Sequence, residues 1–450
     1  MSESQDNLRV VGIASLGESP GRGANRLAAA VLALVLGGYV LLEGLLPLGT
    51  AVQIGADEGF ELAKATLCLK GRSLYTEVWN DQPPLHTWLI SGLLRRVSAS
   101  VLGPRLVSVG FAVVLLGSLF VLCRRVSGVG VAGLAAALVV ASPGFLELSS
   151  SCMLEIPSLA TAVAALALLL AGGAKHWPAR EACCGVVFGL ALQIKLVPAI
   201  LLSLAAVIVW VRERDGARPR RRTLASLAAL GASLAATYVA VDWLIEGGAY
   251  LRYFGQSWAS HFGAAKSLEY GSAAEHGFDW GLLLKNWDTT LPALFGVVVL
   301  VRRLRESRMA ALPLSWLALC MAVFTLHRPW WPYYYVHTSL PLCWCAAEGI
   351  HALAGRLRRG RSRWLAAALA VYAVCALSWM VGRLYLQAQG MRHSAQLYSE
   401  PVLREMARLR PYAESLYAER TVYSFHAGIA MPPQLAVLPV KRFWAGEMSR

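Results

Sequence analysis

Charged side chains are scarce in this chain of 450 residues, of which 15% are charged and 56% are hydrophobic. In a soluble globular domain about a quarter of the residues are charged, so this composition excludes an ordinary soluble domain. Several catalytic motifs are also missing. The sequence has no Gly-rich phosphate loop after a strand and no H-E-x-x-H, and these absences argue against a nucleotide-binding protein and a zinc protease.

The cysteines form no metal-binding pattern. Nine are present, none is spaced as C-x-x-C, and most lie within apolar runs, where a free cysteine behaves as a small hydrophobic side chain. Cys68 and Cys152 fall in segments that we expect outside the membrane, and the sequence does not pair them. We therefore predict no zinc site.

Acidic residues are few as well, with 27 Asp and Glu against 42 Lys and Arg and a formal net charge of +15. Such an excess is also found in nucleic-acid-binding proteins. Here the arginines lie in short segments between apolar runs, which is the distribution of cytoplasmic loops in membrane proteins. We therefore expect the membrane, and no nucleic acid, as a partner.

Long apolar runs are what the sequence has in abundance, and about 20 apolar residues cross a bilayer as a helix. The chain is therefore predicted to be an all-α polytopic membrane protein with about eleven transmembrane helices. Residues 1–25 are polar, and we expect them in the cytoplasm, followed by a retained signal anchor. The predicted spans are 28–48, 103–122, 128–145, 153–172, 182–194, 196–211, 222–244, 286–301, 310–327, 333–352 and 364–386.

Basic loops decide the predicted orientation. Placing every Arg-rich or Lys-containing loop in the cytoplasm requires segment 84–98 to lie along the membrane surface as a juxtamembrane helix instead of crossing it. The transmembrane domain then covers 26–386, with outer loops at 49–102 and 245–285 and an outer C-terminal tail at 387–450. The cytoplasmic loops in this arrangement are 123–125, 175–180, 212–222, 302–308 and 356–363.

The outer loops and the tail hold most of the polar and aromatic residues between spans, whereas the inner loops are minimal basic turns. This asymmetry indicates that the protein acts at its outer face. In the tail, residues 403–410 read as a charged helix, and TVYSFHAGIAMPP, residues 421–433, reads as a strand that runs into a turn.

Carboxylates gather in the first outer loop. Asp57 and Glu58 are followed by Glu61, which predicts a helix with an acidic face, and Asp81 stands just before Pro83-Pro84. Such residues are often solvated loop charges. Carboxylates brought together in a partly desolvated pocket instead have raised pKa values, which suits one of them to act as a general base.

Two charged residues fall beside later spans. Glu155 begins a span two residues before Pro157, where a carboxylate either stabilises the helix dipole or marks a functional site. Lys195 is a lone cation within a long apolar stretch, and Pro198 breaks the helix nearby. A lysine there can extend its amine to the membrane surface, or it can hold an anionic headgroup.

The late turn HRPWWPYYYVHTSLP, residues 327–341, is rich in aromatic residues, as expected of a membrane-interface belt. His327 and Arg328, close to Tyr334, are candidates for binding a phosphate or a sugar. The second outer loop adds Arg252, His261, Lys266 and His276, each of which is more simply explained as a surface residue.

Several short motifs follow one another along the chain. They are an outer Asp-Glu after the first span, G-x-x-L-Y…W-x-D-Q-P-P-L, GPRLVS, Glu-x-Pro at a span start, G-L-A-L-x-x-K and PWWPYYY…LPL. This order, over about residues 26–390, resembles the membrane-embedded glycosyltransferases of the GT-C class. It is most similar to the bacterial family related to protein O-mannosyltransferases and the lipid A aminoarabinose transferase.

The resemblance implies a transferase in the bacterial inner membrane that takes a sugar from a polyprenyl-phosphate donor at the periplasmic face. Asp57, with Glu58 beside it, would be the catalytic carboxylate that deprotonates an acceptor hydroxyl, and the anomeric carbon would be inverted as the lipid phosphate leaves. The acceptor, which could be a lipid, a glycan or a protein, stays open. The expected donor-binding residues are Asp81, Gln82, Glu155, Lys195, His327, Arg328 and Tyr334.

One residue departs from that family. Where the aminoarabinose transferase has a lysine that contacts the donor phosphate, this chain has the uncharged Gln82, so Lys195, His327 or Arg328 must supply more of the positive charge. The donor sugar therefore stays open. No metal is predicted, although a divalent cation held by Asp57, Glu58 and Glu155 is an alternative.

Two functions of other classes compete with this interpretation, a transporter or flippase of polyprenyl-linked glycans and a non-catalytic scaffold. A transporter would carry charges in mid-span and broken helices in paired halves, whereas the candidate charges here gather at one face.

Overall fold

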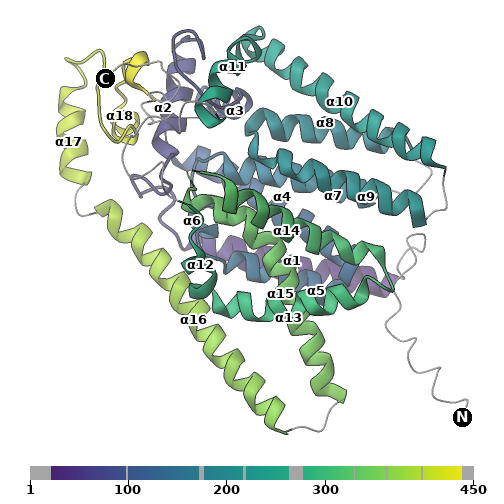
Figure 1. Cartoon of the computed structure of the whole chain (residues 1–450). Coiled ribbons are helices and arrows are strands. Elements are labelled where there is room, and N and C mark those ends of the chain that lie inside the picture. The colour runs from purple at the N-terminus through teal and green to yellow at the C-terminus, as the bar shows by residue number, and fades with distance from the viewer. Residues whose placement is uncertain are drawn as a thin grey trace, which may run out of the picture.

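The computed structural model is an all-helical bundle, and it describes residues 22–97, 100–171, 177–215, 219–262, 277–328, 330–359, 363–396 and 399–437 (Figure 1). A helix occupies each of the eleven predicted spans, so the predicted all-α fold is confirmed. These helices are α1 (Arg22–Gly44), α4 (Leu102–Ser127), α5 (Val129–Val140), α7 (Glu155–Ala171), α8 (Ala179–Ile194), α9 (Leu202–Asp215), α10 (Arg220–Glu246), α13 (Trp287–Arg303), α14 (Ala311–Leu326), α15 (Tyr335–Arg359) and α16 (Arg363–Gln396).

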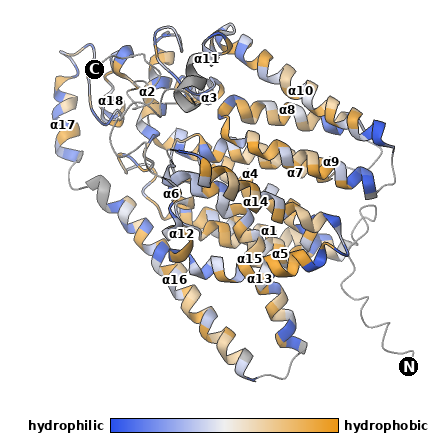
Figure 2. Ribbon diagram, viewed as in Figure 1, coloured by the Kyte–Doolittle hydropathy of each residue, from blue (hydrophilic) through white to orange (hydrophobic). Residues whose placement is uncertain are grey.

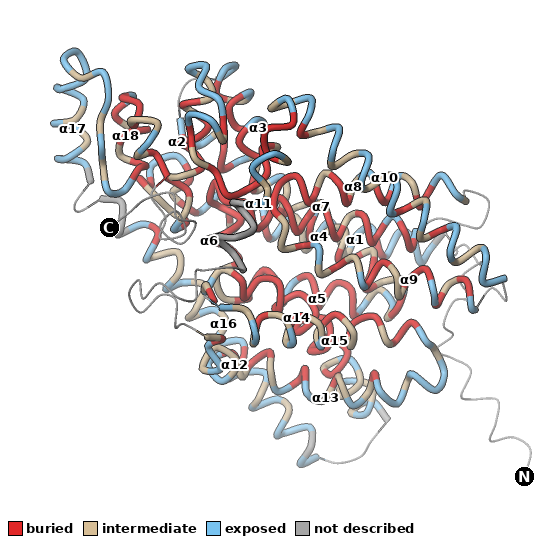
Figure 3. Tube along the Cα trace, turned by 45° about the horizontal axis from the view of Figure 1, so that its top comes forward, coloured by how far each residue is buried: buried red, intermediate tan, exposed pale blue. Residues whose placement is uncertain are grey.

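Within the described part of the chain, five helical segments are long and apolar enough to cross a membrane by themselves. They comprise α1, α4, α10, α16 and the segment Arg308–Leu326, in which the short η6 (Arg308–Ala310) leads into α14. The apolar helices α5 and α7 are shorter and are buried along most of their length. They form the interior of the bundle, and Figure 3 shows burial concentrated along α4, α5, α7 and α8.

Close packing of two helices depends on small residues. A Cβ atom on Gly296 of α13 would lie 1.8 Å from the backbone oxygen of Cys345, and one on Gly349 of α15 would lie 2.0 Å from that of Pro292. Only glycine permits this approach of α13 to α15. Such small-residue contacts are a common way for helices to associate in membranes.

The polar connections separate to two ends of the bundle, because successive long helices run in opposite directions (Figure 1). The last residues of α9, the first residues of α10 and the turn from α13 to α14 lie at the end of the bundle where α1 begins, and Figure 2 shows hydrophilic residues gathered there. The opposite end carries α2 (Glu58–Leu69), α6 (Phe145–Ser149) and α12 (Trp280–Lys285). We call it the outer end, following the predicted orientation.

The ambiguous segment 84–98 contains α3 (Leu85–Leu94), a helix of ten residues. Ten residues rise only about 15 Å, roughly half of the hydrocarbon thickness of a bilayer. One side of α3, including His86 and Ile90, is buried, and the helix packs against α2. The segment therefore forms a short helix, as predicted, and its position along the membrane surface in an outer loop stays a prediction.

The C-terminal tail corrects one prediction. Residues 421–433 do not form a strand, because Val422–Ala427 is a helix, α18, which ends at Gly428 with a φ of 67°. Val422 and Phe425, three residues apart, share one helical face and pack on the first outer loop, so tertiary contacts override the β-prone sequence. Before it, α17 (Ser399–Leu409) covers most of the predicted charged helix, and α16 continues ten residues beyond the predicted span end at 386.

Candidate functional site at the outer end

Asp57 lies at the N-terminus of α2, where the first outer loop turns into a helix. It occupies the N-cap position, its side chain is partly exposed, and its backbone oxygen accepts hydrogen bonds from the amides of Phe60 at 3.1 Å and Glu61 at 3.3 Å. Its neighbour Glu58 is fully buried. Two adjacent acids are therefore in opposite environments, and of the two only Asp57 is accessible to a substrate.

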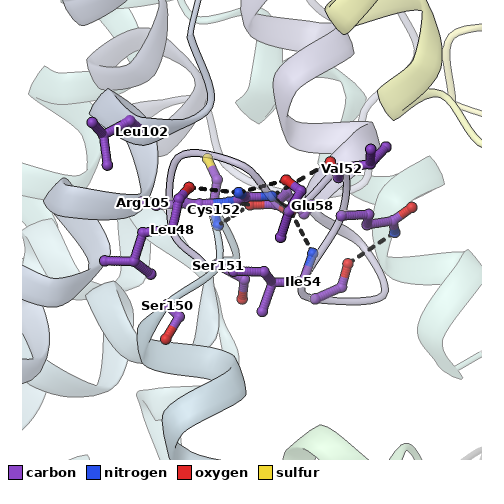
Figure 4. Close-up of polar contacts among 12 residues, drawn as sticks. Leu48, Val52, Ile54, Glu58, Leu102, Arg105, Ser150, Ser151 and Cys152 are labelled. Carbon is purple, nitrogen blue, oxygen red and sulfur yellow. Dashed lines mark hydrogen bonds and ion pairs between the residues drawn. The ribbon is translucent and has the colours of Figure 1, made fainter. Parts of the chain in front are cut away.

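Glu58 is bound on both of its oxygens (Figure 4). Oε1 accepts from Arg105 Nε at 2.8 Å and from the Cys152 amide at 3.1 Å, and Oε2 accepts from Arg105 Nη2 at 2.8 Å and from the Ile54 amide at 2.9 Å. A carboxylate with four such donors is the counter-ion of a buried arginine and not an available base. Glu58, predicted beside Asp57 as catalytic, is thus placed as a support for the loop that carries Asp57.

Arg105 is a residue whose role the sequence did not reveal. Its guanidinium, fully buried in α4, also donates to the backbone oxygens of Leu48 at 2.7 Å and Ala51 at 2.8 Å. It therefore fixes the loop 48–57 from inside. A signal was present, because Arg105 is a lone cation at the start of an apolar run, and a charge in that position is costly without a purpose.

The loop 149–152 connects this clamp to Glu155. Buried Glu43, at the end of α1, accepts hydrogen bonds from the hydroxyls of Ser149 at 2.7 Å and Ser150 at 2.6 Å, while Cys152 donates to Glu58. The two loops also touch directly, since a Cβ on Gly55 would lie 2.6 Å from Ser151 Oγ. The chain segments that carry Asp57 and Glu155 are thus in contact.

Lys195 and Glu155 form a buried ion pair. Glu155 is the first residue of α7, and Lys195 follows α8 in an extended conformation before the turn η3 (Val197–Leu201) that contains Pro198. The ammonium of Lys195 also lies 5.2 Å from the ring centre of Tyr333 and 5.6 Å from that of Tyr334. Cation–π attraction to both rings adds to the ion pair in holding this lysine at the outer end.

The charge of Asp57 influences the pKa values of Lys195 and Tyr333. Burial alone would lower the pKa of Lys195, but Glu155, and after it Tyr334 and Asp57, raise it above the usual value. The pKa of Tyr333, in the short turn η7 (Pro332–Tyr334), is raised by burial, by Tyr334 and by the charges of Asp57, Glu155 and Asp81. Direct contacts join Lys195 to Glu155, Tyr333 and Tyr334, and the charges of Asp57 and Asp81 act on the same residues.

Asp81 and Gln82 are buried and rest on a second polar network. Gln82 Nε2 donates to Asp81 Oδ2 at 2.9 Å, and the side-chain nitrogen Nδ2 of Asn80 donates to the backbone oxygen of Gln82 at 2.8 Å. Asn80 in turn accepts from the buried amine of Lys64 at 3.0 Å, and Lys64 donates to Glu61 at 2.8 Å.

Glu61 is a buried member of this second network, in which it accepts from Lys64. Burial alone would raise the pKa of Glu61, but Lys64 and His86 lower it to about 2. The negative charge of Glu61 is therefore balanced inside the protein by Lys64, its ion-pair partner. The acidic face predicted for α2 is therefore an internal support, and Glu61 is not part of the group around Asp57.

The late aromatic turn contributes unequally. The ring of His327 lies 5.7 Å from that of buried Tyr334, which places it at the edge of the group, whereas Arg328 is exposed beside Gly277 of the second outer loop. Arg252 is exposed and donates to the Gly247 backbone oxygen. Lys266, His276 and the side chain of His261 lie outside the described residues.

A divalent cation does not fit the acids named for it. Of those three acids, Glu58 is committed to Arg105 and Glu155 to Lys195. Over the described ranges, no three His, Cys, Asp or Glu side chains converge as a metal site. The positive charge that this group of residues supplies is that of Lys195.

Known proteins show the same fold. The family model of dolichyl-phosphate-mannose-protein mannosyltransferases matches residues 81–257. The structure of ArnT from Cupriavidus metallidurans bound to undecaprenyl phosphate aligns with a TM-score of 0.57 and 14% identity, over 92% of this chain and 86% of that one. No curated protein sequence matches the chain.

A second similar structure is that of the archaeal oligosaccharyltransferase AglB from Archaeoglobus fulgidus, in complex with an inhibitory peptide and a dolichol-phosphate. It aligns with a TM-score of 0.54 and 14% identity over 91% of this chain, which spans 60% of the length of AglB. These similarities confirm the predicted fold, which the chain shares with ArnT and AglB. The matched family segment includes Asp81, Glu155 and Lys195 and begins after Asp57.

Proposed function

We propose that the chain is a membrane glycosyltransferase that moves a sugar from a polyprenyl-phosphate donor to an acceptor hydroxyl. The observation that carries this proposal is the grouping of a partly exposed carboxylate, Asp57, with a lysine held between Glu155 and two tyrosines, at one end of a fold shared with such transferases. A donor anchored by a lipid stays in the bilayer, so its reacting carbon must be met at the membrane surface. The group lies beside the start of α7 and the end of α8, where a donor held at the membrane surface would reach it.

The proposed reaction is a single displacement. Asp57 accepts the proton of the acceptor hydroxyl, whose oxygen attacks the anomeric carbon as the bond from that carbon to the phosphate oxygen breaks. The sugar changes anomeric configuration, and the electron pair leaves on the lipid phosphate. Lys195 stabilises the negative charge that grows on this phosphate, which is the contribution a positioned cation makes to the transition state.

Glu155 and the tyrosines have positioning roles in this proposal. The ion pair with Glu155 holds the Lys195 ammonium in place before the donor arrives. The rings of Tyr333 and Tyr334 also hold it by cation–π attraction. We assign Asp81, Gln82 and His327 to binding of the sugar.

The orientation and location of the site belong to this proposal too. Arg-rich turns at the end of the bundle where α1 begins indicate that this end faces the cytoplasm. The site would then face the periplasm of a bacterial cell, with the protein in the inner membrane. A donor assembled on the cytoplasmic leaflet would have to be moved across the bilayer before it is used.

The test of the proposed function is transfer in proteoliposomes that hold the purified full chain and a panel of radiolabelled polyprenyl-phosphate sugars. We expect release of polyprenyl phosphate and labelling of an acceptor with one class of donor. Movement of the intact lipid-linked sugar across the bilayer, with no transfer from any donor, would overturn the proposal in favour of a flippase.

Replacing Lys195 by methionine should weaken donor binding. A charge-assisted contact of this kind contributes about 1.5–3 kcal/mol, so we expect the affinity for polyprenyl phosphate to fall roughly 10- to 100-fold. The measurement is binding of polyprenyl phosphate to the detergent-solubilised protein. The double variant Lys195→Met/Glu155→Gln avoids leaving Glu155 as an unpaired buried charge and should bind as poorly.

The matched control is Lys285→Met, because Lys285 is an exposed lysine of α12 at the same end of the bundle. It should leave the affinity unchanged. Equal affinity of the wild type and the double variant would show that Lys195 does not meet the phosphate, and would transfer that role to His327 or Arg328.

A further inference from the structure

The C-terminal tail returns to the first outer loop after more than 300 intervening residues. Figures 1 and 3 both place α18 beside α2, the helix that begins directly after Asp57. Val422 and Phe425 of α18 are buried in one cluster with Val52 of the loop and Leu62 of α2. The tail therefore forms part of the core that supports the site.

A second cluster extends this contact beyond α18. Ala430 and Met431, which follow α18, pack with Ala63 and Leu67 on a neighbouring side of α2. The Leu416 amide donates to the Ala430 backbone oxygen at 3.0 Å, so the segment before α18 folds back onto the segment after it. The tail thus covers α2 with a compact unit and not with a single extended strand.

The contact is tightest near Asp57. A Cβ atom on Gly59 would lie 2.5 Å from Thr421 Oγ1 and 2.7 Å from the Val422 amide nitrogen. Both neighbours belong to the start of α18, and one of them is backbone, which does not move away easily. The first turn of α2, two residues after Asp57, is thus shaped to receive the tail.

One polar contact reaches the loop itself. His426 Nε2 lies 2.9 Å from the backbone oxygen of Val52, and because a carbonyl only accepts, the histidine nitrogen is the donor. Arg105 Nη2 lies 3.4 Å from the same oxygen. Arg105 supports the loop 48–57 from the bundle, and His426 supports it from the tail.

The charge state of His426 suits this role. Burial lowers its pKa, the hydrogen bond to Val52 and the charge of Glu58 raise it, and Arg105 lowers it, with a net shift below the usual value. His426 is therefore neutral at pH 7, with its proton on Nε2. A neutral donor beside the cation of Arg105 adds a bond without adding repulsion.

We infer that the C-terminal tail, through α18 and His426, positions the loop that carries Asp57. The inference concerning sugar transfer rests on the proposed function, whereas the contacts that hold the loop do not depend on it. His426 is a positioning residue, since it acts through Val52 and the loop and touches no substrate. It extends the catalytic unit of the protein from the first outer loop to a segment at the other end of the sequence.

The experiment compares His426→Leu, His426→Gln and wild type in the full-length protein. Leucine keeps the apolar volume and removes the donor, whereas glutamine places an amide nitrogen near the position of Nε2. We expect His426→Leu to speed amide hydrogen exchange in residues 48–57 roughly tenfold, as for loss of one hydrogen bond. It should also lower kcat for sugar transfer without changing KM for the donor, and glutamine should restore both properties.

Tyr412→Ala is the matched control in the tail, because the Tyr412 side chain is 87% exposed. It should change neither property. Unchanged exchange in residues 48–57 for His426→Leu would overturn the inference. Faster exchange that glutamine does not reverse would overturn the role of the histidine donor as well. If wild type transfers no sugar, the proposed function fails, and the exchange data alone then decide whether the tail supports the loop.

Discussion

Asp57→Asn should abolish sugar transfer while the protein remains folded. The carboxamide has the size of the carboxylate and cannot take a proton, and loss of a general base typically costs 10²- to 10⁴-fold in rate. We expect kcat to fall by about that factor. Affinity for polyprenyl phosphate should change little, because the Lys195–Glu155 pair stays intact. The measurements are initial rates in proteoliposomes and binding of polyprenyl phosphate.

The control for this substitution is Asp279→Asn. Asp279 is an exposed aspartate at the same end of the bundle, where it caps α12 by accepting from the Gly281 amide. Asparagine also caps helices well, so transfer should proceed at the wild-type rate. Full activity of Asp57→Asn would show that Asp57 is not the base, and Asp81, the carboxylate that accepts from Gln82 in the same outer loop, would be tested next.

Arg105→Met should destabilise the outer end more than any other single substitution considered for this protein. It leaves the Glu58 carboxylate buried without its cation and removes donors from the backbone oxygens of Leu48 and Ala51. Breaking a buried ion pair from one side costs about 3–5 kcal/mol. We expect a marked fall in the midpoint of thermal unfolding in detergent, and loss of transfer.

A double variant separates stability from positioning. Glu58→Leu/Arg105→Met removes both charges, and such replacements are often close to neutral, so part of the lost stability should return. Transfer should not return, because the loop 48–57 still lacks the guanidinium that held its carbonyl groups. Recovery of full activity in the double variant would contradict a positioning role for the clamp.

An exposed ion pair provides the matched control. Arg404 and Glu400 in α17 are paired at 3.4 Å, with side chains 70% and 76% exposed. Surface pairs contribute little to stability, because solvent and salt screen them. Arg404→Met should therefore leave both the unfolding midpoint and the rate of transfer unchanged.

The neighbouring acids Asp57 and Glu58 show where prediction from sequence reaches its limit. Both were recognised as candidates, because they follow the first span and precede an aromatic segment. Their difference depends on contacts far along the chain, since Glu58 binds Arg105, 47 residues away, and the Cys152 amide, 94 residues away. Asp57 is partly exposed at the start of α2, and no local pattern in the sequence distinguishes it from its buried neighbour.

Other residues were missed for the same reason. His426 contacts Val52 across 374 residues, and its segment is predicted from the sequence to be a strand that runs into a turn. Lys64 and Asn80 are not among the predicted site residues, although Lys64 donates to Asn80 and Asn80 donates to the backbone oxygen of Gln82 beside Asp81. Glu43 and Arg105 did carry a signal, as charges within apolar runs.

The sequence by itself determined the eleven helices, the end of the bundle at which the basic turns lie and the short helix between the first two spans. These features depend on local hydropathy and on the placement of arginines, which act over a single span or turn. The tertiary structure alone decided which acids are neutralised inside the protein, which lysine pairs with Glu155 and what the tail supports. Those outcomes depend on the partners that folding brings together, and an ion pair or a hydrogen bond forms only at contact distance.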